Sequence, residues 1–230
     1  GFCELFDPRF QPWTGGGEHF SFFNQPFAAE NNFKMFCNSL RPLLLKNKED
    51  LGKLEQIRND FSKSMSKQIQ LMWAKKLGLK KYDETLTNEL FNLMIISKAD
   101  FTIFFRKLSD IPENISFLKE SFYLNPTEEL NKKWNIWLTK WQDRMKRNSS
   151  PKEISKLMKK VNPKFTWREW MIVPAYEEAE EGNYHLIQEL QSILSNPYED
   201  QTLEISQKYN RLKPREFFNN GGVSHYSCSS

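Results

Sequence analysis

The side chain in this sequence most suited to chemistry is a thiol close to the C-terminus. Cys228 is the third residue from the end, in the polar segment 219–230, and His225 stands three positions before it. Thiol chemistry needs a thiolate and access to solvent, and a polar terminal segment gives access. A nearby imidazolium lowers the pKa of a thiol, whereas the terminal carboxylate raises it, so the local sequence leaves the charge of Cys228 at pH 7 open. An incidental surface cysteine is the alternative.

Other groups of chemically useful residues have simpler explanations. The acidic run at 177–181 is spread around a helix and indicates a solvated face rather than paired catalytic acids. The glycines at 15–17 are not followed by a lysine and a helix, so they indicate a turn and not a phosphate-binding loop. The three histidines lie far apart, without the spacing of a zinc site. The residues alone assemble no complete set of nucleophile, base and orienting group.

Composition narrows the class of protein. Hydrophobic residues make up 39% of the 230 and charged residues 27%, which is typical of a soluble globular protein. The net charge of +4 is small and gives no indication of a nucleic-acid partner, so we expect none. The lysine-rich stretch 140–160 contains Trp141, which lies on the same helical face as Trp134 and Trp137, so we expect this face to pack in the core. No apolar run reaches the roughly 18 residues of a membrane span, so we expect no membrane partner. Three cysteines are not a disulfide framework and indicate a reducing or matrix-like compartment.

The first residues are unusually aromatic. Nine of the 19 phenylalanines lie within the first 36 positions, and the chain begins at Gly1 without a methionine or a signal peptide. A short, loop-rich segment cannot bury so many rings by itself. We therefore expect a fragment, in which residues 1–46 form a junction that packs on an upstream part of the same chain.

Periodicity predicts a mainly α fold that follows an irregular, phenylalanine-rich segment. A short strand is possible at 19–23, and strand signals are otherwise almost absent. Apolar residues at helical spacing predict helices, of which Pro42 should bend or end the first and Gly78 should close the second. The expected helical ranges are 27–44, 51–77, 86–108, 113–121, 126–145, 166–181 and 184–194, and a further helix begins at 151.

Helix starts carry local signals. Asn125 and Pro126 resemble an N-cap followed by proline at the first helical position. Ser150 and Thr166 are each followed by glutamate three residues later, the pattern of a capping box. Pro174 should kink or break the helix that begins after Thr166.

Several segments together resemble the selenoprotein O family. The first of them resembles the stretch that follows the family's Asp-Tyr-Gly-Pro-Phe motif, and the colinear order covers nearly the whole chain. The matching segments are residues 1–10, 23–26, 99–106, 162–164 with Arg168, 179–184, 196–198, 211–218 and 228–230.

The resemblance implies a protein-kinase-like fold, a pseudokinase, of which this chain would be the C-terminal helical part. It implies an enzyme that transfers AMP from ATP to Ser, Thr or Tyr hydroxyls of proteins, with ATP and Mg²⁺ held by the upstream part. The metal-binding aspartate of that family belongs to the Asp-Tyr-Gly-Pro-Phe motif. No catalytic, nucleotide-binding or metal-binding residue is therefore expected in this chain, which we expect to be inactive on its own.

The resemblance also gives Cys228 a role. Family members that contain selenocysteine carry it third from the end, which implies a redox function for the tail. Many members have an early cysteine as a plausible disulfide partner, but Gln11-Pro12-Trp13 stands there in this sequence. The disulfide partner of Cys228 would then be Cys3, Cys37 or a thiol of another molecule. The family also implies a mitochondrial location and protein substrates as partners.

The expected organisation is a junction at 1–46, helical regions at 47–161 and 162–218, and a flexible redox tail at 219–230. The alternative to an enzyme is a non-enzymatic helical module whose phenylalanine-rich start docks a partner protein.

Overall fold

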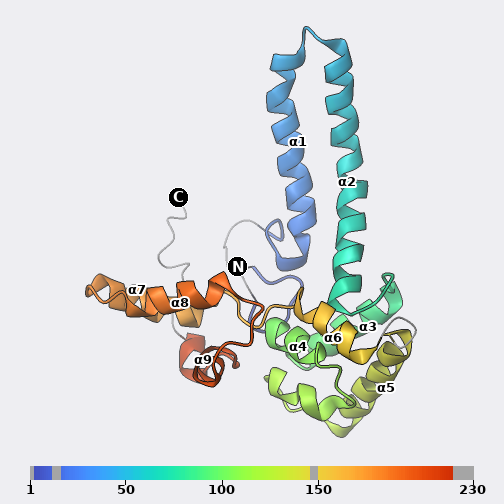
Figure 1. Ribbon diagram of the computed structural model, residues 1–230. Helices are drawn as coiled ribbons and strands as arrows, with labels where there is room; N and C mark the ends of the chain where they lie inside the picture. Colours follow the sequence, from blue (N-terminus) through green and yellow to red (C-terminus); the bar gives the residue numbers. More distant parts are fainter. Residues whose placement is uncertain (1–2, 12–16, 146–149, 220–230) are drawn as a thin grey trace. The chain divides into compact units, whose positions relative to one another are not determined.

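The computed structural model describes residues 3–11, 17–145 and 150–219, and it is built of helices (Figure 1). Within these ranges the only β pairing is an isolated antiparallel bridge between Ala99 and Phe122. The prediction of a mainly α fold is confirmed. The strand considered at 19–23 is wrong, because the 3-10 helix η1 (Phe22–Asn24) occupies this place. The Asn24 side chain donates hydrogen bonds back to the carbonyls of Glu18 and His19, at 3.1 and 3.0 Å, which closes a turn there.

None of the helices in the described ranges has the length and apolar content needed to cross a membrane.

The chain divides into two compact units. The first is Asp7–Met72, and the second contains the described residues from Trp73 onward together with residues 3–6.

The first unit is a hairpin of two long helices, α1 (Gln25–Leu44) and α2 (Lys48–Lys76), which run side by side (Figure 1). The rings of Phe33 and Phe61 stack across it at 4.5 Å, and Arg41 forms an ion pair with Glu55. Pro42 lies inside α1, which ends two residues later at Leu44. The apolar stripe of α2 is only partly covered, since Ile57 is 57% exposed.

The second unit begins with the last residues of α2 and contains all the other helices. They are α3 (Glu84–Ile96), α4 (Phe101–Leu108), η2 (Ile115–Ser121), α5 (Glu128–Met145), α6 (Pro151–Lys159), α7 (Glu169–Glu180), α8 (His185–Ser195), α9 (Leu203–Tyr209) and η3 (Arg215–Asn219).

The single helix expected over 86–108 is wrong, because helical structure is interrupted between the end of α3 at Ile96 and the start of α4 at Phe101. Lys98 adopts a left-handed backbone with φ of 47°, which no α-helix accommodates. Asp100 then starts α4 as its N-cap, and its carboxylate accepts a hydrogen bond from the backbone N–H of Ile103 at 2.9 Å. The aspartate is therefore turned inward at a helix start, instead of lying on a helix face.

Three tryptophans of α5 form the centre of the second unit, as the sequence predicts. Trp134, Trp137 and Trp141 are at most 1% exposed. Each indole N–H is also satisfied, and the acceptors are the Ser97 hydroxyl at 2.8 Å, the Leu86 carbonyl at 2.9 Å and the Leu77 carbonyl at 2.8 Å. A buried indole that keeps a hydrogen bond adds direction to its apolar packing. These bonds tie α5 to the end of α2 and to both ends of α3.

Helix starts agree with the sequence in one case and differ in two. Ser150 forms the expected capping box with Glu153. Helix α5 begins at Glu128 rather than at Pro126, because the Thr127 hydroxyl accepts the hydrogen bond from the N–H of Leu130, at 3.3 Å. The capping box expected at Thr166 is wrong, since α7 begins at Glu169 without a side-chain cap.

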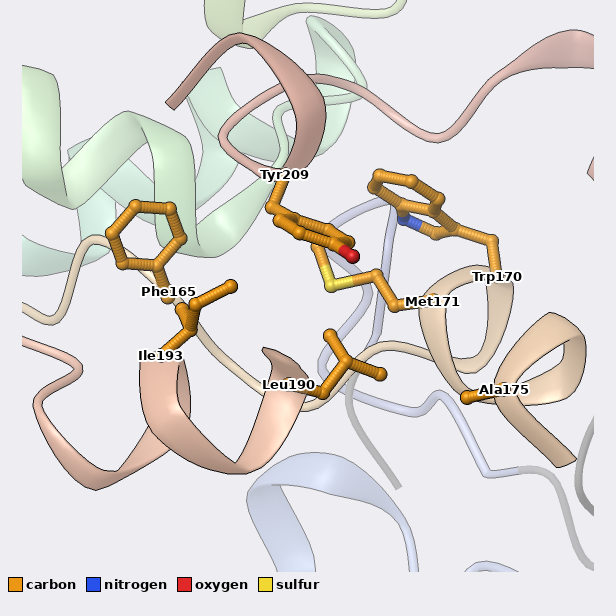
Figure 2. Close-up of a cluster of buried hydrophobic side chains, with 7 residues drawn as sticks. All are labelled: Phe165, Trp170, Met171, Ala175, Leu190, Ile193 and Tyr209. Carbon is orange, nitrogen blue, oxygen red and sulfur yellow. The ribbon is translucent and has the colours of Figure 1, made fainter. Parts of the chain in front are cut away.

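Helices α7, α8 and α9 enclose a second cluster of buried apolar side chains (Figure 2). Gly182, with φ of 86°, separates α7 from α8 at the expected place. Pro174 lies inside α7, which continues to Glu180, so it does not break this helix. The cluster consists of Phe165, Trp170, Met171, Ala175, Leu190, Ile193 and Tyr209.

Candidate functional site

The candidate redox residue Cys228, with His225, lies outside the described residues, and its role stays a prediction. The two thiols expected as its partners, Cys3 and Cys37, are buried, at 7% and 2% exposed. Either thiol would need a local opening of the chain before it could exchange with another.

The most unusual polar site in the described part is a buried cluster of charged side chains centred on Arg168. The Arg168 guanidinium donates two hydrogen bonds to the carboxylate of Asp100, one to each oxygen, at 2.5 and 2.8 Å. Both side chains are almost completely buried, at 4% and 1% exposed. This forked geometry is the strongest arrangement between arginine and a carboxylate, and lysine cannot reproduce it.

Glu4 completes the cluster from the other end of the sequence. The Arg168 guanidinium also donates to the Glu4 carboxylate at 2.8 Å, although 164 residues separate the two. At the residue directly before Asp100, the carbonyl of Ala99 accepts a hydrogen bond from the backbone N–H of Phe6 at 2.7 Å. The first described residues are therefore fixed to the start of α4 by a backbone hydrogen bond and an ion pair.

Tyr123 and Lys213 interact electrostatically with these charges: Glu4, Asp100 and Arg168 act on Tyr123, and Lys213 acts on Glu4. We call the whole site the Arg168 cluster (Glu4, Asp100, Tyr123, Arg168 and Lys213). The backbone N–H of Lys213 donates to the Tyr123 hydroxyl at 2.9 Å. Burial, together with the negative charge of Asp100, raises the pKa of Tyr123, so this hydroxyl stays protonated.

Burial and charge oppose one another within the Arg168 cluster. Burial raises the pKa of Glu4, against the attraction of Arg168, which lowers it. Burial alone would lower the pKa of Arg168, but Asp100 and Glu4 raise it overall, so the guanidinium keeps its charge. The carboxylates of Glu4 and Asp100 both pair with the Arg168 guanidinium, whose positive charge holds them in place.

A second buried polar site surrounds Asn162, and we call it the Asn162 cluster (Lys76, Arg106, Ser109, Asn162 and Asp200). The Asn162 amide donates to the Lys76 carbonyl at 2.9 Å and to the Ser109 hydroxyl at 3.0 Å, and its oxygen accepts a hydrogen bond from the Lys76 ammonium at 2.9 Å. Asn162 is 0% exposed, so its amide is used on both sides. It links the end of α2 to α4 and to the segment after α6.

Lys76 is the unusual group of this second site. Its ammonium lies 4.9 Å from the ring centre of Phe105 and 5.3 Å from that of Phe101. Burial lowers its pKa to about 8. The ammonium is thus held by an amide oxygen and two ring faces, which compensate a buried positive charge less well than a carboxylate does.

Arg106 extends the Asn162 cluster to the loop before α9. Its guanidinium donates to the carbonyls of Lys159 and Asn162, at 3.3 and 3.2 Å, and to the carboxylate of Asp200 at 2.8 Å. The hydrogen bond from Arg106 lowers the pKa of Asp200, which stays ionised. Lys164 adds a bond to the Asp200 carbonyl at 2.7 Å.

The two clusters explain segments that the sequence marks without giving them a role. Asp100 and Arg106 lie in the family-like segment 99–106, and Asn162, Lys164 and Arg168 in the next one. Asp100 and Arg106 belong to the start and the body of α4, and Asn162 and Arg168 contact the two ends of this helix through Ser109 and Asp100, whereas Lys164 contacts Asp200. The N-cap of α4 is the local signal for Asp100, whereas its pairing with Arg168 has no local signal. The acidic run 177–181 is mostly exposed, as expected for a solvated face.

No group of three or more histidine, cysteine, aspartate or glutamate side chains within the described ranges could hold a metal ion. Asp100 and Glu4, which do lie together, are both bound to Arg168. The contacts of the Arg168 cluster hold chain segments in position.

Comparison with known proteins gives one consistent result. The family model described as "Protein adenylyltransferase SelO" matches residues 1–195. The chain is 29% identical over 243 residues to the "Protein nucleotidyltransferase YdiU" of Aromatoleum aromaticum, which covers 100% of this chain and 45% of that protein. It is 30% identical over 256 residues to the protein of the same name in Rhodopirellula baltica, covering 100% of this chain and 46% of that protein. The chain spans less than half the length of these curated relatives.

Proposed function

Because the chain belongs to the protein adenylyltransferase SelO family, we propose that it is the C-terminal helical part of an enzyme that transfers AMP from ATP to Ser, Thr or Tyr hydroxyls of proteins. The observation that carries the proposal is the family match over residues 1–195. The name of the curated relatives supports a nucleotide as substrate. In this reaction the acceptor oxygen bonds to the α-phosphorus of ATP, the bond to the pyrophosphate leaving group breaks, and a base takes the hydroxyl proton.

We assign ATP and Mg²⁺ to the part of the full-length protein that precedes Gly1, within a protein-kinase-like fold. Two observations support this assignment. The chain covers 45% of a curated relative, which leaves room for a nucleotide-binding part. The carboxylates that cluster in the described residues are occupied by Arg168. No step of the transfer is therefore assigned to a residue of this chain.

The proposed contribution of this chain is positional. Glu4 and Phe6 stand at the start of the sequence. Glu4 forms an ion pair with Arg168, just before α7, and the N–H of Phe6 donates to the carbonyl of Ala99, just before α4. A nucleotide-binding part that continues into residue 1 would thus be attached to the helical unit through buried, directional contacts. Such contacts hold a segment more precisely than apolar packing does.

Cys228 is proposed as a redox residue of the tail, and a mitochondrial location goes with the family assignment. Since Cys3 and Cys37 are buried, alkylation of the native protein should label Cys228 faster than Cys37. A disulfide to Cys3 or Cys37, found by mass mapping without reductant, would support the redox role. Equal alkylation rates would contradict a distinctive thiol.

The test of the transferase proposal is the fate of the phosphates of ATP. The full-length protein, incubated with Mg²⁺, a protein acceptor and ATP labelled at the α-phosphate, should transfer the label to the acceptor. The same ATP labelled at the γ-phosphate should transfer none. The 230-residue chain, checked for helical content by circular dichroism, should transfer neither label. Transfer of the γ-label, or metal-dependent transfer of AMP by the 230-residue chain, would overturn the assignment.

A second candidate function is a non-enzymatic helical interaction module. It is supported by apolar side chains that are exposed on the hairpin of the first unit, among them Phe36 at 56%, Leu43 at 79% and Ile57 at 57%. The coding sequence upstream of Gly1 discriminates the two functions, because only the enzyme needs the Asp-Tyr-Gly-Pro-Phe motif there.

A further inference from the structure

A groove between the end of α2 and α6 has a lining that neither buried cluster uses. Its volume is about 480 Å³, which is within the usual range for ligand sites. The apolar lining comes from Gly78, Leu79, Ile154, Leu157 and Val161, and three lysines, Lys75, Lys80 and Lys160, complete it.

The groove has firm walls. The Gly78 backbone has φ of 65°, and a Cβ there would lie 2.6 Å from the Ile154 side chain and 2.8 Å from the Met158 sulfur. Only glycine allows the end of α2 to approach α6 this closely. On the α2 side, the Leu77 carbonyl is bonded to Trp141 and the Lys76 carbonyl to Asn162. A site whose walls are already fixed loses little conformational entropy on binding.

The charged groups that line the groove are all cationic. The helix-end carbonyls are taken, because Ala74 accepts from the N–H of Leu79 at 2.8 Å and Lys159 from Arg106 at 3.3 Å. Lys75, Lys80 and Lys160 are exposed, and within the described ranges none of the three has an ion pair, whereas Lys159 pairs with Asp110 at 2.6 Å. Three uncompensated ammonium groups around an apolar floor favour a ligand with negative charge next to an apolar group.

We propose that this groove binds an acidic, apolar peptide segment of a partner protein, with a leucine- or phenylalanine-like side chain on the apolar floor and aspartate or glutamate at the three lysines. The site is a groove, whose shape fits a single inserted side chain better than a flat lipid surface. The lining has neither arginine nor an aromatic ring on which a base could stack, which distinguishes it from nucleic-acid sites. Inorganic anions would leave the apolar floor uncovered.

The test uses the full-length protein and an array of short peptides in which leucine or phenylalanine is flanked by aspartate and glutamate. Binding of the best peptides is measured by fluorescence anisotropy. Their affinity should fall about tenfold in the triple variant Lys75→Gln, Lys80→Gln, Lys160→Gln. The reason is that each exposed ion pair contributes a fraction of a kcal/mol to about 1 kcal/mol. The matched control is Lys119→Gln with Lys132→Gln, two exposed lysines elsewhere in the same unit. Their replacement should leave the affinity unchanged.

The apolar part of the proposal has its own control. Leu157 is 61% exposed, so Leu157→Ser should weaken peptide binding while the free energy of unfolding stays nearly constant. A peptide with serine at the apolar position should bind more weakly than its parent. Equal binding of the serine peptide would reduce the site to a charge effect and overturn the proposal.

Hydrogen exchange of the full-length protein locates the site. The best peptide should slow exchange at residues 75–80 and 154–161. If these residues are already protected and the peptide does not change their exchange, another part of the same chain covers the groove, and the partner proposal is wrong. Absence of binding across the whole array, or binding only to anionic vesicles, would equally overturn it. None of these readings depends on AMP transfer, so the proposed function can fail or stand separately.

Discussion

The Arg168 guanidinium binds both carboxylate oxygens of Asp100, at 2.5 and 2.8 Å, across 68 residues of sequence. The pair is buried, and Glu4 adds a second carboxylate to the same guanidinium. The Arg168 side chain thus joins three segments: the N-cap of α4 at Asp100, the N-terminal residues at Glu4, and the segment before α7, to which Arg168 itself belongs.

Removal of Arg168 is expected to be severely destabilising. Arg168→Met leaves two buried carboxylates without their cation, so the free energy of unfolding should fall by about 3–5 kcal/mol. Arg168→Lys keeps the charge but loses the fork, and its loss should be intermediate. Urea denaturation measures both. As a control, Arg144→Gln removes a half-exposed ion pair with Asp83 and should cost at most about 1 kcal/mol. A loss for Arg168→Met as small as that of Arg144→Gln would contradict the structure.

Lys76 should give stability a particular dependence on pH. Its pKa is about 8 in the folded protein against an ordinary value of 10.5, so between these values the unfolded chain binds the proton more tightly than the folded protein does. Stability contributed by this residue therefore rises with pH from about 8 to 10.5 and is lost as the pH falls.

The variant Lys76→Met isolates this effect. The free energy of unfolding of the parent minus that of the variant should increase from pH 8 to pH 10, by at most about 3 kcal/mol over the full interval. Lys75→Met, which changes the exposed neighbour, should show no such increase. A flat difference for Lys76→Met would mean that the ammonium is not buried as described.

Gly52, inside α2, and Gly78, two residues after its end, should respond in opposite ways to replacement by alanine. Gly78→Ala places a Cβ against Ile154 and Met158 at a positive φ, and should lower the free energy of unfolding by more than about 1 kcal/mol. Gly52 lies inside α2, and a Cβ there would meet nothing within 4 Å, so Gly52→Ala should raise it by roughly 0.5–1 kcal/mol. Chemical denaturation of both variants tests the opposite signs, and equal signs would be inconsistent with this packing.

Trp141 and Trp170 allow the contribution of an indole hydrogen bond to stability to be measured separately from the contribution of the buried indole volume. Trp141→Phe leaves the buried Leu77 carbonyl without its donor, which should cost about 1–3 kcal/mol beyond the lost volume. The indole N–H of Trp170 has no hydrogen-bond partner in the described structure, so Trp170→Phe should lose only volume. The difference between the two variants in thermal or urea unfolding is the measurement. A larger loss at Trp170 would reverse the assignment.

Local chemistry predicted the parts of this fold that depend on neighbouring residues. The capping box at Ser150, the buried face of Trp134, Trp137 and Trp141, and the turn at Gly182 each arise within a few residues of the sequence. The break at Lys98 was missed, because apolar residues continue at helical spacing through 86–108 while the inward turn of Asp100 depends on a distant arginine.

The same reason explains the failed cap at Thr166 and the missed clusters. The Thr166 pattern is local, but Arg168 stays extended before α7, where its side chain reaches Asp100. Asn162 and Lys76 meet across 86 residues. Such contacts depend on the whole second unit, and no spacing in the sequence encodes them. The resemblance marked several of these residues without assigning them a contact.

The pairing of Glu4 with Arg168 also sets an order of events during synthesis. Ribosomes add about 5–20 residues per second, so roughly 8–33 seconds separate the two residues on a growing chain. During this interval Glu4 has no cation from α7, and the Ala99 carbonyl that accepts from Phe6 is itself made late. The Glu4 ion pair therefore forms only after translation has passed Arg168, and any nascent protein shortened before Arg168 keeps at most the Phe6 hydrogen bond at this edge.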